Sequence, residues 1–216
     1  MMHVKADLHV HSNYSADSII QPKELVHYAQ KRGLNAVAIT DHNQVEGARK
    51  IARETNFLVI PGTEVSSLHG HIVGLNVQEV IPMGLPAIDT VEKIHQAGGI
   101  AIACHPFALF KGSVGKHTNK DFDAVETKNA SALPYGNASR KAEEIADKLK
   151  LPRVAGTDAH IGQAIGYAYT VIEAEQNVED IVKSIVAGHC QPFGGPIPIS
   201  IRMQNALRFL SLYIKR

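Results

Sequence analysis

The sequence predicts an α/β fold made of repeated strand and helix units around a parallel sheet. As far as about residue 175, short apolar runs alternate with longer segments of helical periodicity, which is typical of βα repeats. The 216 residues are enough to bury one substantial core. No internal repeat, low-complexity tract or linker rich in Gly, Ser or Pro divides the chain. We therefore expect one domain over residues 1–216.

The predicted strands are short apolar runs, each separated from the next by a helical pattern or a turn. This arrangement favours a parallel sheet, in which neighbouring strands are joined by crossover helices. In chain order the predicted strands are Val4–Val10, Ala36–Thr40, Phe57–Ile60, Ile72–Leu75, Ile100–Cys104, Ala124–Glu126, Arg153–Ala155 and Ala168–Ile172.

The predicted helices lie between these strands. They are Pro22–Lys31, Val45–Glu54, Ala87–Gln96, Asn137–Lys150 and Val178–Ala187. Pro22 in the opening turn and Gly33 just past the end mark the limits of the first helix, and Asn177 is a good N-cap for the last.

Two segments lack clear periodicity, residues 107–122 and residues 188–198. A loop as long as the first is usually functional or mobile in a compact domain. After the second, residues 199–216 are predicted to form a terminal helix that packs on the barrel of strands. Its apolar positions at near-helical spacing are Ile201, Leu207, Leu210 and Ile214. Its cationic side chains, expected in solvent, are Arg202, Arg208, Lys215 and Arg216.

Composition excludes several classes of protein. The 22 Lys and Arg residues nearly balance the 21 Asp and Glu residues, so net charge gives no strong signature of binding to nucleic acid or to an anionic membrane. Cys104 and Cys190 are far apart and have no CxxC spacing, which favours a reducing compartment over a disulfide framework. The chain has no signal-peptide pattern and no apolar run of membrane-spanning length. We therefore expect a cytoplasmic protein, with its oligomeric state left open.

Histidine is abundant, with 12 residues, and most of the candidate ligands fall in short motifs at predicted strand ends. The motifs are Asp7-Leu8-His9-Val10-His11, Thr40-Asp41-His42, Gly62-Thr63-Glu64, Cys104-His105-Pro106 and Gly156-Thr157-Asp158-Ala159-His160. The carboxyl ends of parallel strands in a barrel form one face, so these side chains are expected to meet there. Alternate residues of a strand point to the same side, which lets His9 and His11 reach one ion. The motifs together predict a metal centre.

Single histidines outside these motifs are interpreted as structural. His27 and His95 lie on predicted helices, and His3 lies near the start of the chain. Cys104 ends an apolar strand and is expected to be buried filler among nitrogen and oxygen ligands.

The motifs resemble, in their order, those of the polymerase-and-histidinol-phosphatase (PHP) superfamily, specifically its short stand-alone metal-dependent phosphoesterases. The resemblance runs from about Asp7 to His160 and includes Asp17. It implies a distorted (βα)7 barrel, similar to a TIM barrel, with two or three divalent ions at the carboxyl ends of the strands. Mixed imidazole and carboxylate ligands suit zinc, manganese or iron.

The resemblance also implies how the ligands divide. One ion would be held by His9, His11, Glu64 and Asp158, and a second by Glu64, His71 and His105. A third would be held by Asp17, His42 and His160. Asp17 stands where many relatives have histidine, so this site is expected to be weaker. His71 is preferred over His69 because it directly precedes the strand at Ile72–Leu75.

Other polar residues are candidates for supporting roles. Asp7 and Asp41 are expected to orient ligating imidazoles or to pack beneath the ions. Glu126, at a strand end, either contacts substrate or a metal-bound water, or is simply solvated. Cationic or imidazole donors that could bind a phosphate are Lys111, Lys116, His117, Lys128 and Arg140.

The function implied is hydrolysis of a phosphomonoester or phosphodiester, in a small metabolite or a nucleotide, by a hydroxide that bridges two ions. Glu64, Asp158 and His160 are the residues assigned to catalysis. Two alternatives are weighed against it. A silent metal-binding accessory module should have lost ligands, and none is lost. An amidohydrolase acting on C–N bonds usually has a bridging carbamylated lysine, whereas Glu64 is the bridging candidate here.

Overall fold

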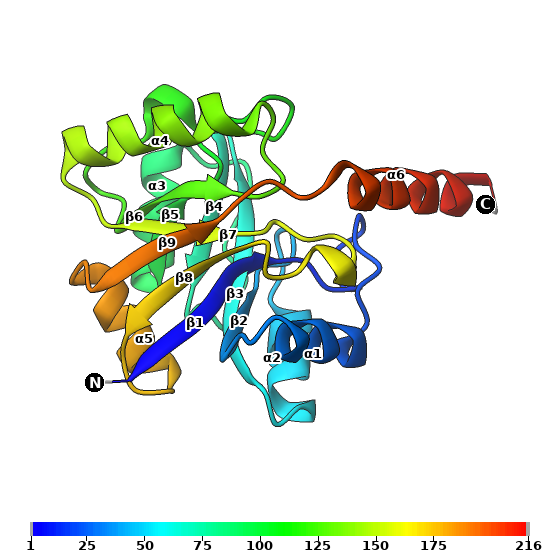
Figure 1. Ribbon diagram of the computed structural model, residues 1–216. Helices are drawn as coiled ribbons and strands as arrows, with labels where there is room; N and C mark the ends of the chain where they lie inside the picture. The colour runs from blue at the N-terminus through cyan, green and yellow to red at the C-terminus, as the bar shows by residue number, and fades with distance from the viewer. Residues whose placement is uncertain (1, 215–216) are drawn as a thin grey trace.

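The core of the fold is a strongly curved mixed sheet. The computed structural model describes residues 2–214, with side chains up to residue 206 (Figure 1). Within this part of the chain the sheet has nine strands in the order β7-β6-β5-β4-β3-β2-β1-β8-β9. The strands are β1 (His3–Val10), β2 (Ala36–Ile39), β3 (Leu58–Ser67), β4 (Gly70–Leu75), β5 (Ile100–Ala103), β6 (Ala124–Asn129), β7 (Arg153–Gly156), β8 (Ala168–Glu173) and β9 (Cys190–Gly194).

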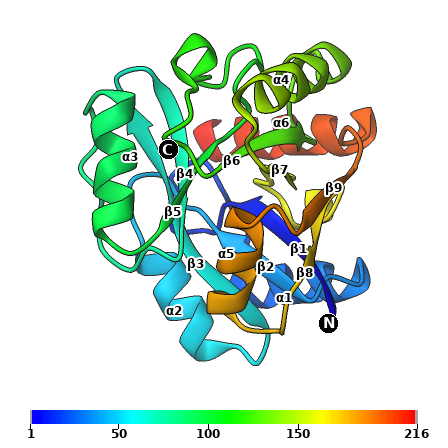
Figure 2. The same ribbon diagram turned by 90° about the vertical axis from the view of Figure 1, so that its left-hand side faces the viewer.

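Six α-helices accompany the sheet in the described part of the chain. They are α1 (Pro22–Lys31), α2 (Glu46–Glu54), α3 (Ala87–Gln96), α4 (Tyr135–Leu149), α5 (Val178–Val186) and α6 (Ile199–Ile214). Figures 1 and 2 show α3 and α4 over one part of the sheet and α1 and α2 over the opposite part. Every predicted strand and helix is present, with small shifts at most ends. The Asn177 cap is also confirmed, since its Oδ1 accepts from the backbone N–H of Asp180 at 2.9 Å.

The expectation of a parallel sheet is only partly right. β1, β2 and β3 are mutually parallel, as are β5, β6 and β7. In contrast, β4 runs antiparallel to both β3 and β5, and β8 runs antiparallel to both β1 and β9. A parallel neighbour of β3 would need a crossover of a dozen or more residues. β3 instead continues to Ser67 and turns directly into β4 at Gly70, which makes a hairpin.

The two halves of the sheet meet at a seam between β1 and β7, which nearly closes the barrel. Asp158 donates its backbone N–H to the carbonyl of His9 at 2.7 Å, and His11 donates to the carbonyl of Ala159 at 3.0 Å. These bonds lie just beyond the end of β7, so the strands touch at their carboxyl ends. The distorted barrel implied by the resemblance is therefore confirmed.

Apolar side chains fill the barrel interior and one end of it. The main cluster takes residues from β1 through β8, among them Leu8, Ile60 and Ile172, and α5 packs Ile181 and Ile185 against the same cluster. The polar motifs are thereby left at the other end of the strands, above an apolar floor.

The C-terminal region differs from the sequence-based expectation in two respects. Residues 188–198, expected to be irregular, contain β9, an edge strand whose Pro192 obscures the pattern. Arg202, expected in solvent, donates to the backbone carbonyls of Ala130, Ser131 and Ile197 at 2.7–3.0 Å. Leu207, Arg208, Leu210, Ile214, Lys215 and Arg216 lie outside the described side chains.

The predicted terminal helix exists as α6, which runs outward from the barrel (Figure 1). Ile201, in its first turn, packs on the apolar cluster beneath α1. Among residues 2–214, no helix combines the length and apolar character needed to cross a bilayer.

Candidate metal centre and active site

The side chain of Glu64 lies at the centre of the polar end of the barrel. Its Oε2 is 3.1 Å from Nε2 of both His9 and His11. Its Oε1 is 2.8 Å from Nδ1 of His71 and 2.9 Å from Nε2 of His105. Glu64 is buried in β3, and its hairpin partner β4 supplies His71. One carboxylate therefore separates two pairs of imidazoles.

Asp158 completes a group of four possible ligands on the Oε2 side of Glu64. One donor atom from each of His9, His11, Glu64 and Asp158 lies within 4.8 Å of the others, and all four residues are buried. Within this group, Oδ1 of Asp158 lies 3.4 Å from Nε2 of His11 and 3.9 Å from Nε2 of His9. Four nitrogen and oxygen donors at this spacing can surround one ion.

A second group lies at the mouth of the site. Oδ2 of Asp17 is 3.2 Å from Nε2 of His42 and 3.1 Å from Nε2 of His160, and His11 borders the same space. Asp17 is 43% exposed, in contrast to the buried Glu64. Donor atoms of His42, Glu64 and His71 form a further possible group. His42 could therefore be a ligand in either of these two groups.

The donor set fits metal ions better than it fits a hydrogen-bonded core. Neither ring nitrogen of the buried His11 has a well-aligned hydrogen bond to any described residue, although Nε2 is close to two carboxylates. Buried polar atoms without partners are rare and call for an explanation, such as a bound ion. Nitrogen and carboxylate oxygen ligands suit Zn²⁺, Mn²⁺ and Fe²⁺.

The backbone supports the same interpretation. His105 and Asp158 both have positive φ angles, of 33° and 57°, although neither is glycine. Such conformations are costly for residues with a Cβ, and they concentrate at functional sites.

Charges in the cluster are strongly coupled. Burial opposes ionisation of Glu64, but His9 and the other imidazoles outweigh it and hold the pKa of Glu64 well below its ordinary value. Burial likewise opposes protonation of His11, but Asp158 and Glu64 raise the pKa of His11 to about 9. The site therefore attracts positive charge, whether protons or metal ions.

Comparison with known proteins identifies the family. Residues 136–190 match a family model described as PHP-associated. An uncharacterized protein of Methanocaldococcus jannaschii is 38% identical over 141 residues, which is 59% of this chain and 82% of that protein. The chain belongs to the PHP family.

One solved structure has a similar fold, and one further relative is similar in sequence. A crystal structure of a two-domain Bacteroides vulgatus protein containing a predicted PHP-like metal-dependent phosphoesterase has a TM-score of 0.70 and 17% identity. The match covers 90% of this chain and 65% of the Bacteroides vulgatus chain. A 5'-3' exoribonuclease of Haemophilus influenzae is 34% identical over 105 residues, 45% of this PHP chain and 38% of the enzyme.

Three predicted supporting carboxylates of the PHP chain are buried, but only one touches an imidazole. Glu126 Oε1 is 3.1 Å from Nδ1 of His9, and its Oε2 accepts from the backbone N–H of His105 at 2.7 Å. The alternative of a solvated Glu126 is therefore wrong. Asp7 instead accepts from the backbone N–H groups of Thr157 and Gly166, at 2.8 and 2.9 Å.

Asp41, the third, binds Ser12 through both the backbone N–H and the hydroxyl, each at 2.6 Å. It fixes the turn that follows His11 in the PHP motif. Asp7 and Asp41 thus hold the backbone around the ligands. Neither carboxylate orients a ligating imidazole directly, which was one of the two roles expected for them.

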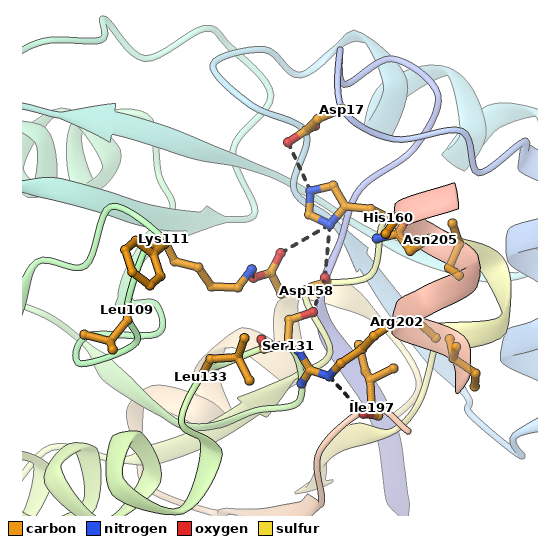
Figure 3. A pocket seen from close by; sticks show the side chains of 15 residues that line it. Asp17, Leu109, Lys111, Ser131, Leu133, Asp158, His160, Ile197, Arg202 and Asn205 are labelled. Atoms are coloured by element: carbon orange, nitrogen blue, oxygen red, sulfur yellow. Dashed lines mark hydrogen bonds and ion pairs between the residues drawn. The ribbon is translucent and has the colours of Figure 1, made fainter. Parts of the chain in front are cut away.

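Of the predicted phosphate-binding residues, Lys111 alone reaches the cluster within the described structure. Its Nζ is 2.5 Å from Oδ2 of Asp158 (Figure 3). Burial opposes protonation of Lys111, but Asp158 outweighs it and raises the lysine pKa. Arg140 lies exposed on α4, paired with Glu144. Among the residues that the structure describes, three other candidates make no contact with the cluster: Lys116, His117 and Lys128.

Of His69 and His71, the structure places His71 beside Glu64. His69 accepts from the backbone N–H of Ala87 and stacks on His117 with ring centroids 3.9 Å apart.

Cys104 is buried as expected, although its Sγ is 3.6 Å from Oε1 of Glu64. Burial, followed by the negative charge of Glu64, raises the pKa of the Cys104 thiol well above its ordinary value, which disfavours a thiolate ligand.

Sequence reasoning missed Asn129 in the PHP site. Its Nδ2 donates to Oε2 of Glu126 at 2.9 Å and lies 3.4 Å from Oδ2 of Asp158. The rule that found the other residues would have found this one, because Asn129 is the last residue of β6.

Proposed function

We propose that this chain is a metal-dependent phosphoesterase that hydrolyses a phosphomonoester or phosphodiester of a small metabolite or nucleotide. The observation that carries the proposal is the position of Glu64. Each of its two oxygens faces a pair of imidazoles, which is the arrangement expected of a carboxylate shared by two ions.

Two to three divalent ions, of zinc, manganese or iron, are proposed. His9, His11, Glu64 and Asp158 would hold the first, and Glu64, His71 and His105 the second. Asp17, His42 and His160 would hold the third. Ions in such a cluster supply Lewis acidity, which makes a water molecule more acidic and offsets the charge of a phosphate.

The chain's own residues provide orientation and a cation. Glu126 fixes the ring of His9 through Nδ1, which turns Nε2 towards Glu64. The ammonium group of Lys111 lies between Asp158 and the open cavity, where it is placed to donate to a phosphate oxygen that no ion contacts. Glu64, Asp158 and His160 are the proposed catalytic residues, because they shape the space where phosphorus would lie.

The exoribonuclease relative supports a nucleotide or a nucleic acid end among the substrates. The near-zero net charge supports a short substrate over a long duplex, because binding to many phosphates requires a basic surface. We therefore propose a small phosphorylated compound or a nucleic acid end as the substrate.

The proposal is tested with purified protein, supplied with Mn²⁺ or Zn²⁺, and a panel of phosphorylated metabolites, nucleotides and short oligonucleotides. Released phosphate or nucleoside is measured, with Glu64→Ala as the inactive variant. His95→Ala is the matched control, since His95 pairs with Asp123 on the surface. Activity that survives both chelation and Glu64→Ala would contradict the proposal.

Two other outcomes would identify the alternatives. A protein that binds ions but hydrolyses nothing would be an accessory module. Hydrolysis of amides, with the phosphoesters untouched, would indicate a C–N hydrolase.

A further inference from the structure

A cavity of about 500 Å³ opens directly beside the proposed metal centre. Asp17, Lys111, Asp158 and His160 line both this cavity and the smaller space that faces Glu64. One substrate molecule could therefore place its phosphate at the cluster and its organic group in the cavity. Pockets for small ligands usually measure about 300–1,000 Å³, so this volume suits the organic part of a substrate.

Away from the metal end, apolar side chains form much of the cavity wall, beside the polar Ser131, Arg202 and Asn205. Leu109 and Leu133 lie on one side and Ile197 on the other (Figure 3), and Ile201 also lines the cavity. Leu109 and Leu133 are each more than half exposed, so this apolar surface is accessible in the protein as described. A polyol such as glycerol would leave this apolar surface uncovered.

Phe110 adds an aromatic ring at the cavity entrance. Its side chain is fully exposed, and it borders both the cavity and the space facing Glu64. Its backbone has a φ of 62°, which is unfavourable for a residue with a Cβ. An exposed aromatic ring on such a backbone, next to the phosphate-facing Lys111, is placed to stack on a planar group.

Arg202 holds the far wall in place. Its guanidinium donates from Nε to Ile197, from Nη1 to Ser131 and from Nη2 to Ala130, in each case to the backbone carbonyl. The bonds to Ala130 and Ser131 tie the first turn of α6 to the segment after β6, and the bond to Ile197 joins that turn to the residues just before the helix. Arg202 is thus a positioning residue, which keeps Ile201 facing the cavity.

We infer that the organic group of the substrate carries an aromatic ring, which this cavity holds between Phe110 and the first turn of α6. The ring is a nucleobase or a simple aryl group, and both share the flat apolar surface that the walls fit. The inference rests on the proposed phosphoesterase function and names the substrate class of that same site.

Steady-state kinetics on paired substrates tests the inference. Phenyl phosphate and a nucleoside monophosphate are compared with glycerol phosphate, which has no ring. We expect kcat/KM to be at least about tenfold higher for an aromatic substrate, since one apolar group in a pocket is worth about 10–200-fold. Preference for the nucleotide over phenyl phosphate would identify a nucleobase as the ring. Equal kcat/KM for all three would overturn the inference.

Variants on α6 separate the cavity wall from the helix. Ile201→Ala should raise KM for phenyl phosphate more than for glycerol phosphate, with kcat little changed. Met203→Ala is the matched control, because Met203 is exposed on the same helix and does not line the cavity. Arg202→Met should reproduce the KM effect of Ile201→Ala. If Ile201→Ala and Met203→Ala behave alike on phenyl phosphate, α6 is not part of the binding wall.

Binding of phenylphosphonate and methylphosphonate, measured by calorimetry, distinguishes failure of the inference from failure of the proposed function. Neither compound is a phosphoester, so binding is seen without turnover. Tighter binding of phenylphosphonate, weakened by Phe110→Ala, supports the cavity even if no ester is hydrolysed. Equal affinity for the two compounds in an enzyme that does hydrolyse esters would overturn the inference alone.

Discussion

Glu126 and His9 form a buried pair in which Oε1 of Glu126 lies 3.1 Å from Nδ1 of His9. The pair sets the direction of the imidazole, because the opposite nitrogen, Nε2, then points to Glu64. Carboxylates in this position commonly fix both the tautomer and the orientation of a ligating histidine.

Replacement of Glu126 by Ala should therefore weaken metal binding about 10–100-fold without removing a ligand. The affinity is measured by competition with a chromogenic chelator. Glu92→Ala, on the exposed face of α3, is the control. An unchanged affinity in a folded Glu126→Ala protein would show that the pair has no orienting role.

Replacement of Glu64 by Ala should remove more metal than any other single change. The reason is that both oxygens of Glu64 face imidazole pairs, so one substitution affects two proposed sites. Elemental analysis after metal-supplemented expression gives the number of ions per chain. A full complement of ions in this variant would contradict the shared carboxylate.

Replacement of Asp17 by Ala should lower the metal content by about one ion and leave the fold intact. Asp17 is a partly exposed loop residue, so it is less preorganised than ligands on strand ends. Lost activity should be partly restored at high metal concentration by mass action. Loss of all the ions, or of none, would show that Asp17 does not belong to a separate third site.

Gly112 packs against the ring of His71, and its replacement by Ala should disturb that ligand. A Cβ on Gly112 would lie 2.9 Å from Nε2 of His71, and φ at Gly112 is +62°. Gly115, in the same loop, also has a positive φ, but a Cβ there would meet nothing closer than 3.6 Å.

Both glycine variants should lose about 1 kcal/mol of unfolding free energy from backbone strain. The Gly112→Ala protein alone should also lose metal affinity. Thermal unfolding and metal titration measure the two effects separately. Equal metal affinity in Gly112→Ala and Gly115→Ala would exclude a role for the Gly112 contact in placing His71.

The stability of the metal-free protein relative to an Asp7→Asn variant should depend on pH. Burial raises the pKa of Asp7 from 3.8 to about 6, although backbone N–H groups partly oppose it. The folded state therefore holds a proton that the unfolded state has lost, so this stabilising contribution is present below pH 4 and is lost as pH rises through 6.

The difference in unfolding free energy between the natural protein and Asp7→Asn should fall by about 3 kcal/mol over that interval, at 1.36 kcal/mol per pKa unit. Chemical denaturation of both proteins at a series of pH values measures it. A difference that stays constant with pH would contradict the raised pKa.

The strand positions and the meeting of the motifs were predictable, because apolar runs are short and the polar residues follow them at once. The antiparallel direction of β4 was not predictable from the sequence. Pro61 and Gly62 in the middle of β3, and two serines at its end, hide the hairpin. β9 was hidden for a similar reason, because an exposed edge strand with a proline has no apolar alternation.

Site residues on strands were easier to predict than those on loops. Lys111 belongs to a loop whose path depends on its packing against Gly70 and His71, so no local pattern distinguishes it from Lys116. Arg202 was misplaced because its partners are backbone carbonyls, which leave no trace in the side-chain sequence.

The seam between β1 and β7 links ion retention to local opening of the barrel. His9 lies in β1, His11 follows it directly and Asp158 follows β7, so an ion held by all three would link β1 to β7 across the seam. Separation of β7 from β1 would break that link. Amide hydrogens along this boundary, such as those of His11 and Asp158, should then exchange with solvent more slowly as metal occupancy rises, so the kinetics of ion escape and of barrel opening would share one step.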